Sequence, residues 1–454
     1  MKSNFFKKTV SMALAVAMCS GIACSAGFFT KAAEPEDVDV DVDDDIVAAE
    51  NLEIEKDLTS GTGETFVLHG LTYQVIDDTS VAVIGVKRPI IAIPANGHLP
   101  IRETVSHNKK SYTVTFIGEN AFASNSRLKK LTLPYTVTSI GPSAFSGCSN
   151  LQEINIPDLV TYISTECFYR CSKLEKVTLP NSITSIGYFA FSHCESLQEI
   201  NIPDSVTLIN SLAFAYSGLK SASIPNSVTS INHRTFYRCK NLEKVSLPSV
   251  TSINRDAFGY CENLKDVKLS NALTSIGKGA FENCKSLQEI KLPDSLTFID
   301  SLAFRNSDLR SISIPNSITS INQWTFQNCK ELEKVHLPDS LTSIGKGAFE
   351  NCKNLQEIKL PDSLTSIGYC AFIYCERLQE INIPDSVTLI NSLAFAYSGL
   401  RSVYIPNSVT FIGKQAFMSC NDLCYFVAPE RLKTDISSLS ILEGCDNVQV
   451  DYYD

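Results

Sequence analysis

The sequence predicts a solenoid of parallel short strands joined by short helical or 3-10 turns, with a β-hairpin unit capping its N-terminal end. Phenylalanine recurs every 22 or 23 residues through most of the 454-residue chain, and a short apolar strand pattern recurs in step with it. Before the first repeat, apolar and polar residues alternate as in a hairpin. A globular chain of this length would divide into two or three domains, but a solenoid grows in one dimension because each unit contacts only its neighbours.

The first 33 residues have the pattern of a signal peptide. Lys2, Lys7 and Lys8 make the start positive, an apolar run follows over 9–26, and small residues allow cleavage after Ala26 or near 32–33. We expect cleavage rather than a retained membrane anchor because the apolar run is short and an acidic stretch follows it. Lipid attachment at Cys24 stays open as an alternative, although Gly21 stands where a lipoprotein cleavage box expects leucine.

Residues 34–57 form an acidic block that we expect to be a disordered linker. The block holds twelve acids and one base, and it has no periodic apolar face to bury. A calcium loop is the alternative, but its sharp turn needs glycine where Asp44 stands. The EF-hand-like offsets are those of Asp39, Asp41, Asp43 and Glu50. The block accounts for the net charge of −10, so the body is nearly neutral and lacks the basic field that nucleic-acid binding needs.

Residues 58–116 predict an N-terminal β cap. Apolar and polar residues alternate over 71–76 and 81–84, and the polar residues 77–80 between them predict a turn. A solenoid needs an atypical end unit because its first coil would otherwise expose a core layer. For the same reason we expect residues 425–454 to form a C-terminal cap.

Residues 117–424 hold fourteen repeat units. In each unit a Leu-x-x-Ile-x-Ile strand ends at proline, a second extended segment follows, and an N-cap-type residue precedes a turn that buries Ala-Phe. Residues 197–219 and 378–400 are nearly identical, which indicates that blocks of four units were duplicated. The repeated phenylalanines are residues 122, 145, 168, 191, 214, 236, 258, 281, 304, 326, 349, 372, 395 and 417.

The unit Leu-x-x-Ile-x-Ile-Pro-x-Ser-Val-Thr-x-Ile-Gly-x-x-Ala-Phe-x-x-Cys resembles the BspA-type bacterial leucine-rich repeat. The resemblance covers about residues 117–424, and the cap before it is similar to the family's usual N-terminal hairpin unit. It implies a leucine-rich-repeat solenoid that is secreted or held at the surface of anaerobic bacteria. Members of the family are associated with adhesion to host matrix proteins, host cells or other bacteria.

Ten of the 16 cysteines lie three residues after a repeat phenylalanine, and Ser or Asn fills the same slot in the other four units. This replacement favours reduced, stacked thiols over disulfides. If cysteines of neighbouring units formed disulfides, replacing a single one by Ser or Asn would leave its partner cysteine without a bond. A zinc site is not expected, since cysteines 22 or 23 residues apart would form a line rather than a tetrahedron. Cys424 and Cys445 lie outside this pattern and could join to close the C-terminal end.

The sequence shows no catalytic constellation and predicts a protein that is not an enzyme and binds no cofactor or metal. The six histidines fall at unrelated positions of the unit, none beside a Ser, Cys or acid in a nucleophile signature. Glycine occurs singly, without a phosphate-binding loop.

The outward strand positions are the candidate ligand face. Lys and Glu alternate there on adjacent units, which is also the pattern of a solvated sheet surface with cross-strand ion pairs. Tyrosines occur at its C-terminal end, so we expect a hot spot there. We expect the chain to be a monomer that is secreted or held at the cell surface, and its partner to be an extracellular protein or glycoprotein. The alternative function is that of a passive structural stalk or spacer of the cell envelope. The candidate residues are Lys334, His336, Glu357, Lys359, Glu380, Asn382, Tyr404 and Tyr425.

Overall fold

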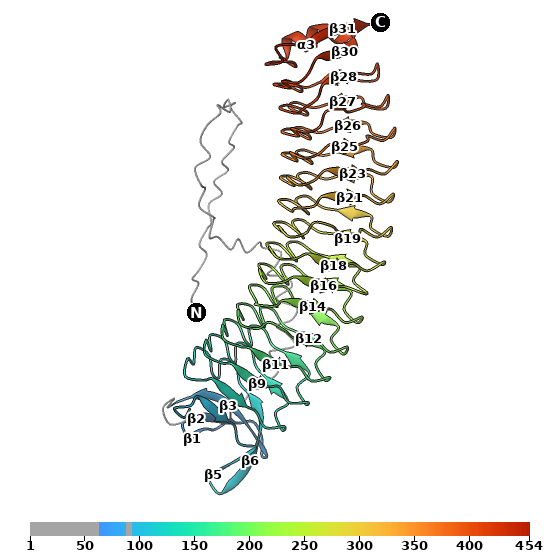
Figure 1. The fold of residues 1–454 in the computed structure, drawn as a ribbon. Coiled ribbons are helices and arrows are strands. Elements are labelled where there is room, and N and C mark those ends of the chain that lie inside the picture. The colour runs from blue at the N-terminus through green and yellow to red at the C-terminus, as the bar shows by residue number, and fades with distance from the viewer. Residues whose placement is uncertain (1–62, 88–92) are drawn as a thin grey trace, which may run out of the picture. The chain divides into compact units, whose positions relative to one another are not determined.

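The computed structural model describes residues 63–87 and 93–454, which belong to one compact unit. The predicted signal peptide, the acidic linker, Cys24 and the candidate calcium loop lie outside the described residues. Figure 1 shows short strands in coils that follow one another in chain order, with almost no helix. The fold is the predicted solenoid of parallel strands.

The N-terminal β cap is a sheet with the strand order β1-β2-β3-β6-β5. Strands β1 and β2 form one antiparallel hairpin, β2 and β3 a second and β5 and β6 a third, while β3 and β6 run parallel. Strand β6 also pairs with β8 of the first full coil, so the cap continues the solenoid. The bounds are β1 (Thr65–Leu68), β2 (Leu71–Val75), β3 (Ser80–Val86), β5 (Thr104–His107), β6 (Lys110–Ile117) and β8 (Ser139–Ile140).

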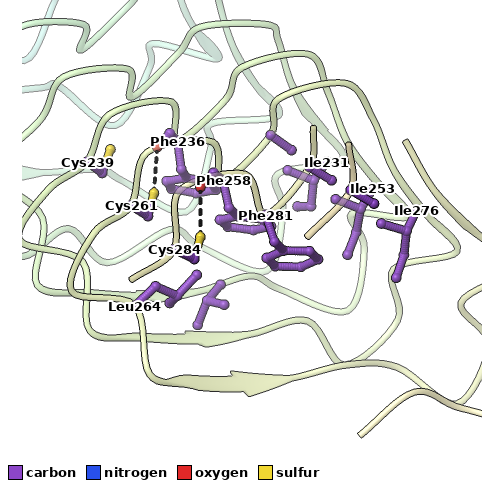
Figure 2. Packing of buried hydrophobic residues seen from close by; sticks show 14 of the residues in the cluster. Ile231, Phe236, Cys239, Ile253, Phe258, Cys261, Leu264, Ile276, Phe281 and Cys284 are labelled. Atoms are coloured by element: carbon purple, nitrogen blue, oxygen red, sulfur yellow. Dashed lines mark hydrogen bonds between the residues drawn. The ribbon is translucent and has the colours of Figure 1, made fainter. Parts of the chain in front are cut away.

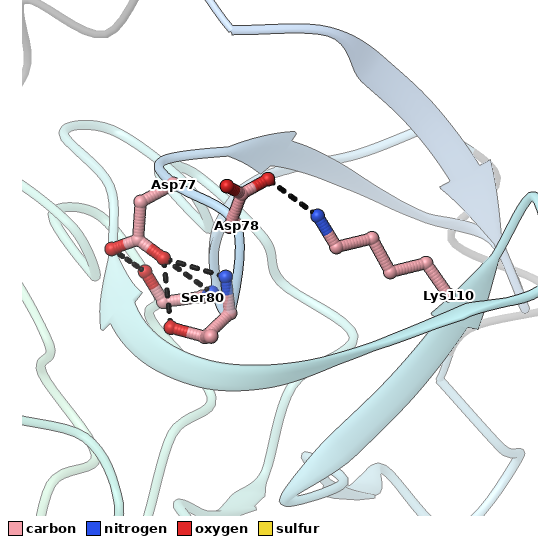
Figure 3. Close-up of polar contacts among 5 residues, drawn as sticks. Asp77, Asp78, Ser80 and Lys110 are labelled. Carbon is pink, nitrogen blue, oxygen red and sulfur yellow. Dashed lines mark hydrogen bonds and ion pairs between the residues drawn. The ribbon is translucent and has the colours of Figure 1, made fainter.

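The predicted turn between β2 and β3 is held by Asp77 (Figure 3). Its Oδ1 accepts hydrogen bonds from the backbone N–H groups of Thr79 at 2.7 Å and Ser80 at 2.9 Å. Asp78 beside it forms an ion pair with Lys110 of β6 at 2.6 Å. Asp commonly bonds its own backbone two residues on in turns of this kind, so the sequence explains the local structure.

Each coil contributes up to two short strands, and all strand pairs within the repeat region are parallel and in register. The first row comprises β4 (His98–Pro100), β7 (Lys130–Thr132), β9 (Glu153–Asn155), β11 (Lys176–Thr178), β14 (Ser221–Ser223), β16 (Lys244–Ser246), β18 (Asp266–Lys268), β21 (Ser311–Ser313), β23 (Lys334–His336), β25 (Glu357–Ile358), β28 (Ser402–Tyr404), β30 (Tyr425–Pro429) and β31 (Gln449–Tyr453). The second row begins at β8 and continues with β10 (Tyr162–Ile163), β12 (Ser185–Ile186), β13 (Leu208–Ile209), β15 (Ser230–Ile231), β17 (Ser252–Ile253), β19 (Ser275–Ile276), β20 (Phe298–Ile299), β22 (Ser320–Ile321), β24 (Ser343–Ile344), β26 (Ser366–Ile367), β27 (Leu389–Ile390) and β29 (Phe411–Ile412).

The third side of each coil is a chain of overlapping turns rather than a helix. In one coil, Ala144, Ser146 and Cys148 donate their backbone N–H groups to carbonyls three residues earlier, as in a 3-10 turn. The alternate residues donate to the following coil instead, as Phe145 does to the carbonyl of Cys167 at 3.0 Å. Because every second N–H bonds to the next coil, these turns tie neighbouring coils together and cannot extend into a helix.

The N-cap-type residues that precede these turns do not cap a helix. Asn232 donates its side-chain amide to the carbonyl of Ile209 in the preceding coil at 2.8 Å, and the Ser164 hydroxyl bonds the carbonyl of Ile140 in the same way. The sequence pattern was therefore correct about polar side chains bonding to backbone, but the acceptor is a carbonyl of the neighbouring coil. The side chains satisfy backbone groups between coils, which would otherwise be buried without a partner.

A continuous stack of phenylalanine rings fills the core. Neighbouring repeat phenylalanines from Phe122 to Phe417 have ring centroids 5.1–5.6 Å apart with nearly parallel planes. Figure 2 shows three of these rings, Phe236, Phe258 and Phe281, beside the cysteines of the same coils. The repeat phenylalanines are fully buried, because each ring is covered by the coil before it and the coil after it.

The cysteines beside this stack are free, buried thiols that bond to backbone. The Sγ of Cys261 donates to the carbonyl oxygen of Phe236 in the preceding coil at 3.0 Å, and Cys284 donates to Phe258 at 3.3 Å (Figure 2). Cys445 continues this row by donating to the carbonyl of Phe417 at 3.2 Å, so its placement outside the pattern was wrong. Cys424 is exposed, and both thiols are free.

The C-terminal segment adds a 3-10 turn η2 (Glu430–Leu432), a short helix α3 (Lys433–Ser438) and the strand β31, which pairs in parallel with β30. Leu432, Ile436 and Ile441 are buried against the last coil, so this segment covers the end of the core. Within the described part of the chain, no helix is long and apolar enough to cross a membrane.

Candidate interaction face

The strand face is defined here as the exposed side chains of the first strand row. All eight candidate residues lie on it or directly continue its strands. Lys334 and His336 are on β23, and Tyr404 is the last residue of β28. Tyr425 begins β30 and pairs in register with Ser402, which in turn forms a bridge to Glu380. Parallel pairing in register therefore brings residues about 23 positions apart in the chain to adjacent places on one surface.

The charged part of the strand face consists of cross-strand ion pairs. Lys334 Nζ lies 2.5 Å from Glu357 Oε2, and the equivalent pair Lys130–Glu153 lies at 2.8 Å near the N-terminal end. The hydrogen bond from Lys334 lowers the pKa of the Glu357 carboxyl. Both side chains are well exposed, so solvent screens the pair and it contributes little to stability. This part of the face has the properties of a solvated sheet surface.

The aromatic part of the strand face lies at its C-terminal end. Tyr404 is 51% exposed and Tyr425 is 56% exposed. The ring of Tyr453, on β31, stacks on Tyr404 with centroids 5.3 Å apart and an interplanar angle of 14°. The Tyr453 hydroxyl donates a hydrogen bond to the carbonyl of Ile405 at 2.9 Å, which fixes the ring in place. Tyr404 is thus held by a neighbouring ring while part of its surface stays open to solvent.

Sequence reasoning missed Tyr453. It lies beyond the last repeat, where the 22- or 23-residue spacing no longer indicates position. The apolar residues Val450 and Tyr452 alternate with polar ones in this segment, and that alternation was the available signal for a further strand.

Exposed aromatic side chains are concentrated in the C-terminal coils. Of the seven large exposed aromatic residues among the described residues, five lie between positions 369 and 425. They are distributed over the strand face, the turns and the second strand row. The five are Tyr369, Tyr374, Tyr404, Phe411 and Tyr425, and the other two are Tyr135 and Phe298.

Two features of the described residues bear on chemistry at the surface, a pocket and the arrangement of metal-ligating side chains. A shallow depression of about 410 Å³ lies beside the first coil, and Arg127 is the one charged residue in its lining. Within residues 63–87 and 93–454, no group of three or more His, Cys, Asp or Glu side chains is arranged to hold a metal ion. The surface geometry is suited to non-covalent contact over an extended area.

Comparison with known families decides the classification. The model of the BspA type leucine-rich repeat region matches in six copies, over residues 115–243, 207–333 and 297–424. The chain belongs to the BspA-type leucine-rich-repeat family. The region that matches the BspA-type model begins within β6 and ends after the last repeat phenylalanine. Its family and its solenoid fold indicate a protein that uses its repeats for protein–protein interaction.

Several solved structures similar to this BspA-type chain are described as leucine-rich-repeat proteins of bacteria. The crystal structure of a leucine-rich repeat protein from Bacteroides ovatus is 29% identical, covers 86% of this chain and 100% of its own, and has a TM-score of 0.70. A leucine-rich cell surface protein from Faecalibacterium prausnitzii is 24% identical over 87% of this chain and 96% of its own, with a TM-score of 0.48. The pneumococcal vaccine antigen PcpA is 16% identical over 87% and 100%, with a TM-score of 0.40. None of the curated proteins compared with the chain matches it.

Proposed function

We propose that this chain is an exported, non-enzymatic binding protein whose strand face engages an extracellular protein or glycoprotein in adhesion. The proposed face runs from Lys334 and His336 to Tyr425, with its energetic centre at the C-terminal end. The observation that carries the proposal is that the two large exposed aromatic side chains of the strand face, Tyr404 and Tyr425, both lie at its C-terminal end. Tyrosine and tryptophan dominate protein interface hot spots because they bury a large area at low conformational cost.

The stacked pair Tyr404–Tyr453 supports this location. A side chain that is already ordered before binding loses less entropy when the partner arrives. Tyr404 is such a side chain, because the fixed Tyr453 ring covers one of its sides. Export is supported by the signal-peptide pattern of the first 33 residues. A passive stalk or spacer is the second candidate function, and the paired charges such as Lys334–Glu357 favour it for the middle of the face.

The test is binding of the exported chain to an immobilised panel of intact host matrix and mucus proteins. Each of Tyr404→Ala and Tyr425→Ala should weaken saturable binding by about 2 kcal/mol or more, which is roughly 30-fold, and the double variant should weaken it further. Phe298→Ala is the matched control, since Phe298 is also exposed, at 47%, but lies on the second strand row. Equal binding by the double variant and the control would exclude the C-terminal strand face. Lack of saturable binding across the panel would favour the stalk.

A further inference from the structure

The turns carry a second surface that the strand face does not explain. We define the turn face as the outward side chains of the segments from the N-cap-type residue to the cysteine slot. In its central coils Tyr216, Tyr237 and Tyr260 surround Arg238, whose guanidinium carbon lies 5.7, 5.6 and 4.9 Å from the three ring centroids. The rings also pack edge to face on one another, with centroids 5.9 and 5.5 Å apart. We call these four residues the Tyr–Arg patch.

Arg238 has no acidic partner within the part of the chain that the structure describes. Its Nε is shielded from solvent and makes no hydrogen bond. Two other turn-face arginines do have an acidic partner: Arg234 pairs with Asp256 at 3.0 Å, and Arg305, whose Nε is likewise shielded and without a hydrogen bond, pairs through Nη1 with Glu282 at 3.3 Å. A guanidinium whose shielded donor has no partner has already lost part of its hydration, so a carboxylate that reaches it gains more than at a fully hydrated arginine.

The local charge is also unusual for this chain. Residues 232–239 hold Arg234 and Arg238 and no acid, and none of the other thirteen turn segments has two cations without an acid. Arg234 is paired with Asp256, so among the described residues Arg238 carries the positive charge of this segment that has no ion-pair partner, on a body that is nearly neutral. Charge complementarity therefore favours an anionic partner here.

We propose that the Tyr–Arg patch is a docking site for a protein partner, which inserts an acidic side chain against Arg238. Arginine and tyrosine are the residue types enriched at the centres of protein interfaces. The rings pack against each other across successive coils, so the patch presents ring edges and hydroxyls on a continuous surface. A small free ligand would instead require a concave pocket. This site is separate from the strand face, and each can fail without the other.

The experiment measures binding of the full chain to poly-L-glutamate, an acidic polypeptide, and to hyaluronan, a polysaccharide that carries carboxylates. Arg238→Gln should weaken poly-L-glutamate binding by about tenfold or more, because it removes a charge-assisted, forked hydrogen-bonding group. Arg310→Gln is the matched control: it removes the same charge from an exposed arginine that makes no ion pair among the described residues. Arg238→Lys keeps the charge and the apolar stem, and should show an intermediate loss.

Thermal unfolding of each variant establishes that it is folded; should Arg238→Gln not fold, Arg238→Lys and Tyr260→Phe replace it. The Tyr260 variant keeps the ring beside Arg238 and removes only the hydroxyl. If Arg238→Gln and Arg310→Gln weakened poly-L-glutamate binding equally, the proposal would be overturned, since binding would then follow net charge alone. Tighter binding of hyaluronan than of poly-L-glutamate would overturn the protein partner, and no binding of poly-L-glutamate would overturn the site. Tyr404→Ala should leave poly-L-glutamate binding unchanged, which separates this test from that of the strand face.

Discussion

Replacing Phe258 with alanine removes one ring from the middle of the phenylalanine stack. The ring is fully buried, and it lies 5.4 Å from both Phe236 and Phe281. Burial of a phenylalanine side chain is worth about 1.5–3 kcal/mol, and each aromatic pair adds about 0.5–1.5 kcal/mol. The burial contribution and the two aromatic pairs together predict that Phe258→Ala lowers the free energy of unfolding by about 4 kcal/mol. This value lies within the range of about 3–5 kcal/mol for Phe→Ala in protein cores.

The assay is urea denaturation followed by circular dichroism, with Phe298→Ala as the exposed control. The control should change the free energy of unfolding by no more than about 0.5 kcal/mol. Phe258→Leu keeps most of the apolar volume and should cost less than Phe258→Ala. A loss below about 1 kcal/mol for Phe258→Ala would refute the reasoning, because it would mean that neighbouring coils do not depend on each other's rings. A changed denaturant slope would show that the two halves of the solenoid unfold separately.

Three further predictions concern the thiols, the cap and the strand face. Burial raises the pKa of Cys239 to about 11 and that of Cys329 to about 12, so a thiol reagent at mildly alkaline pH should label the exposed Cys424 in the folded protein long before these two. Hydrogen bonds from Ser80 and Thr79 lower the pKa of Asp77 to about 2. The ionised carboxylate of Asp77 should therefore stabilise the turn fully above the ordinary aspartate pKa, and this stabilisation should be lost as the pH falls through about 2. An NMR titration of the Asp77 carboxyl carbon will measure this pKa. Lys334→Gln should leave the midpoint of unfolding in the same urea assay nearly unchanged, since its ion pair with Glu357 is exposed and screened by solvent.

The repeat spacing was sufficient to predict the core. A side chain that recurs in every coil of an in-register parallel solenoid must lie beside its own copies, so the Phe122–Phe417 stack follows from counting residues. The outward strand positions follow from the same register. Cys445 and Tyr453 could not be placed in this way, because they lie beyond the last unit, where η2 and α3 interrupt the spacing.

The turn conformation could not be predicted from residue preferences. The residue before each cysteine slot adopts a left-handed backbone, and it is often not glycine: His193, Tyr216 and Arg238 have φ of 59°, 59° and 56°. Such residues rarely adopt this conformation on their own. Here the conformation is repeated in coil after coil and is held by hydrogen bonds between coils, such as that from Tyr216 N–H to the carbonyl of Tyr237 at 2.8 Å. Tertiary context therefore decides the backbone, and the sequence alone predicted a helical turn.

The duplicated blocks separate what the fold requires from what a partner could select. Phe214 and Phe395 occupy equivalent positions in residues 197–219 and 378–400, and both are fully buried. Tyr216 and Tyr397 are likewise equivalent, yet the next coil brings Arg238 beside the first, whereas Ser419 fills the corresponding slot after the second. The core tolerates either residue because the slot faces outward. Since stacking cannot explain the difference, the charge at position 238 is the kind of change that selection for a binding surface would retain, and the Arg238→Gln experiment examines it directly.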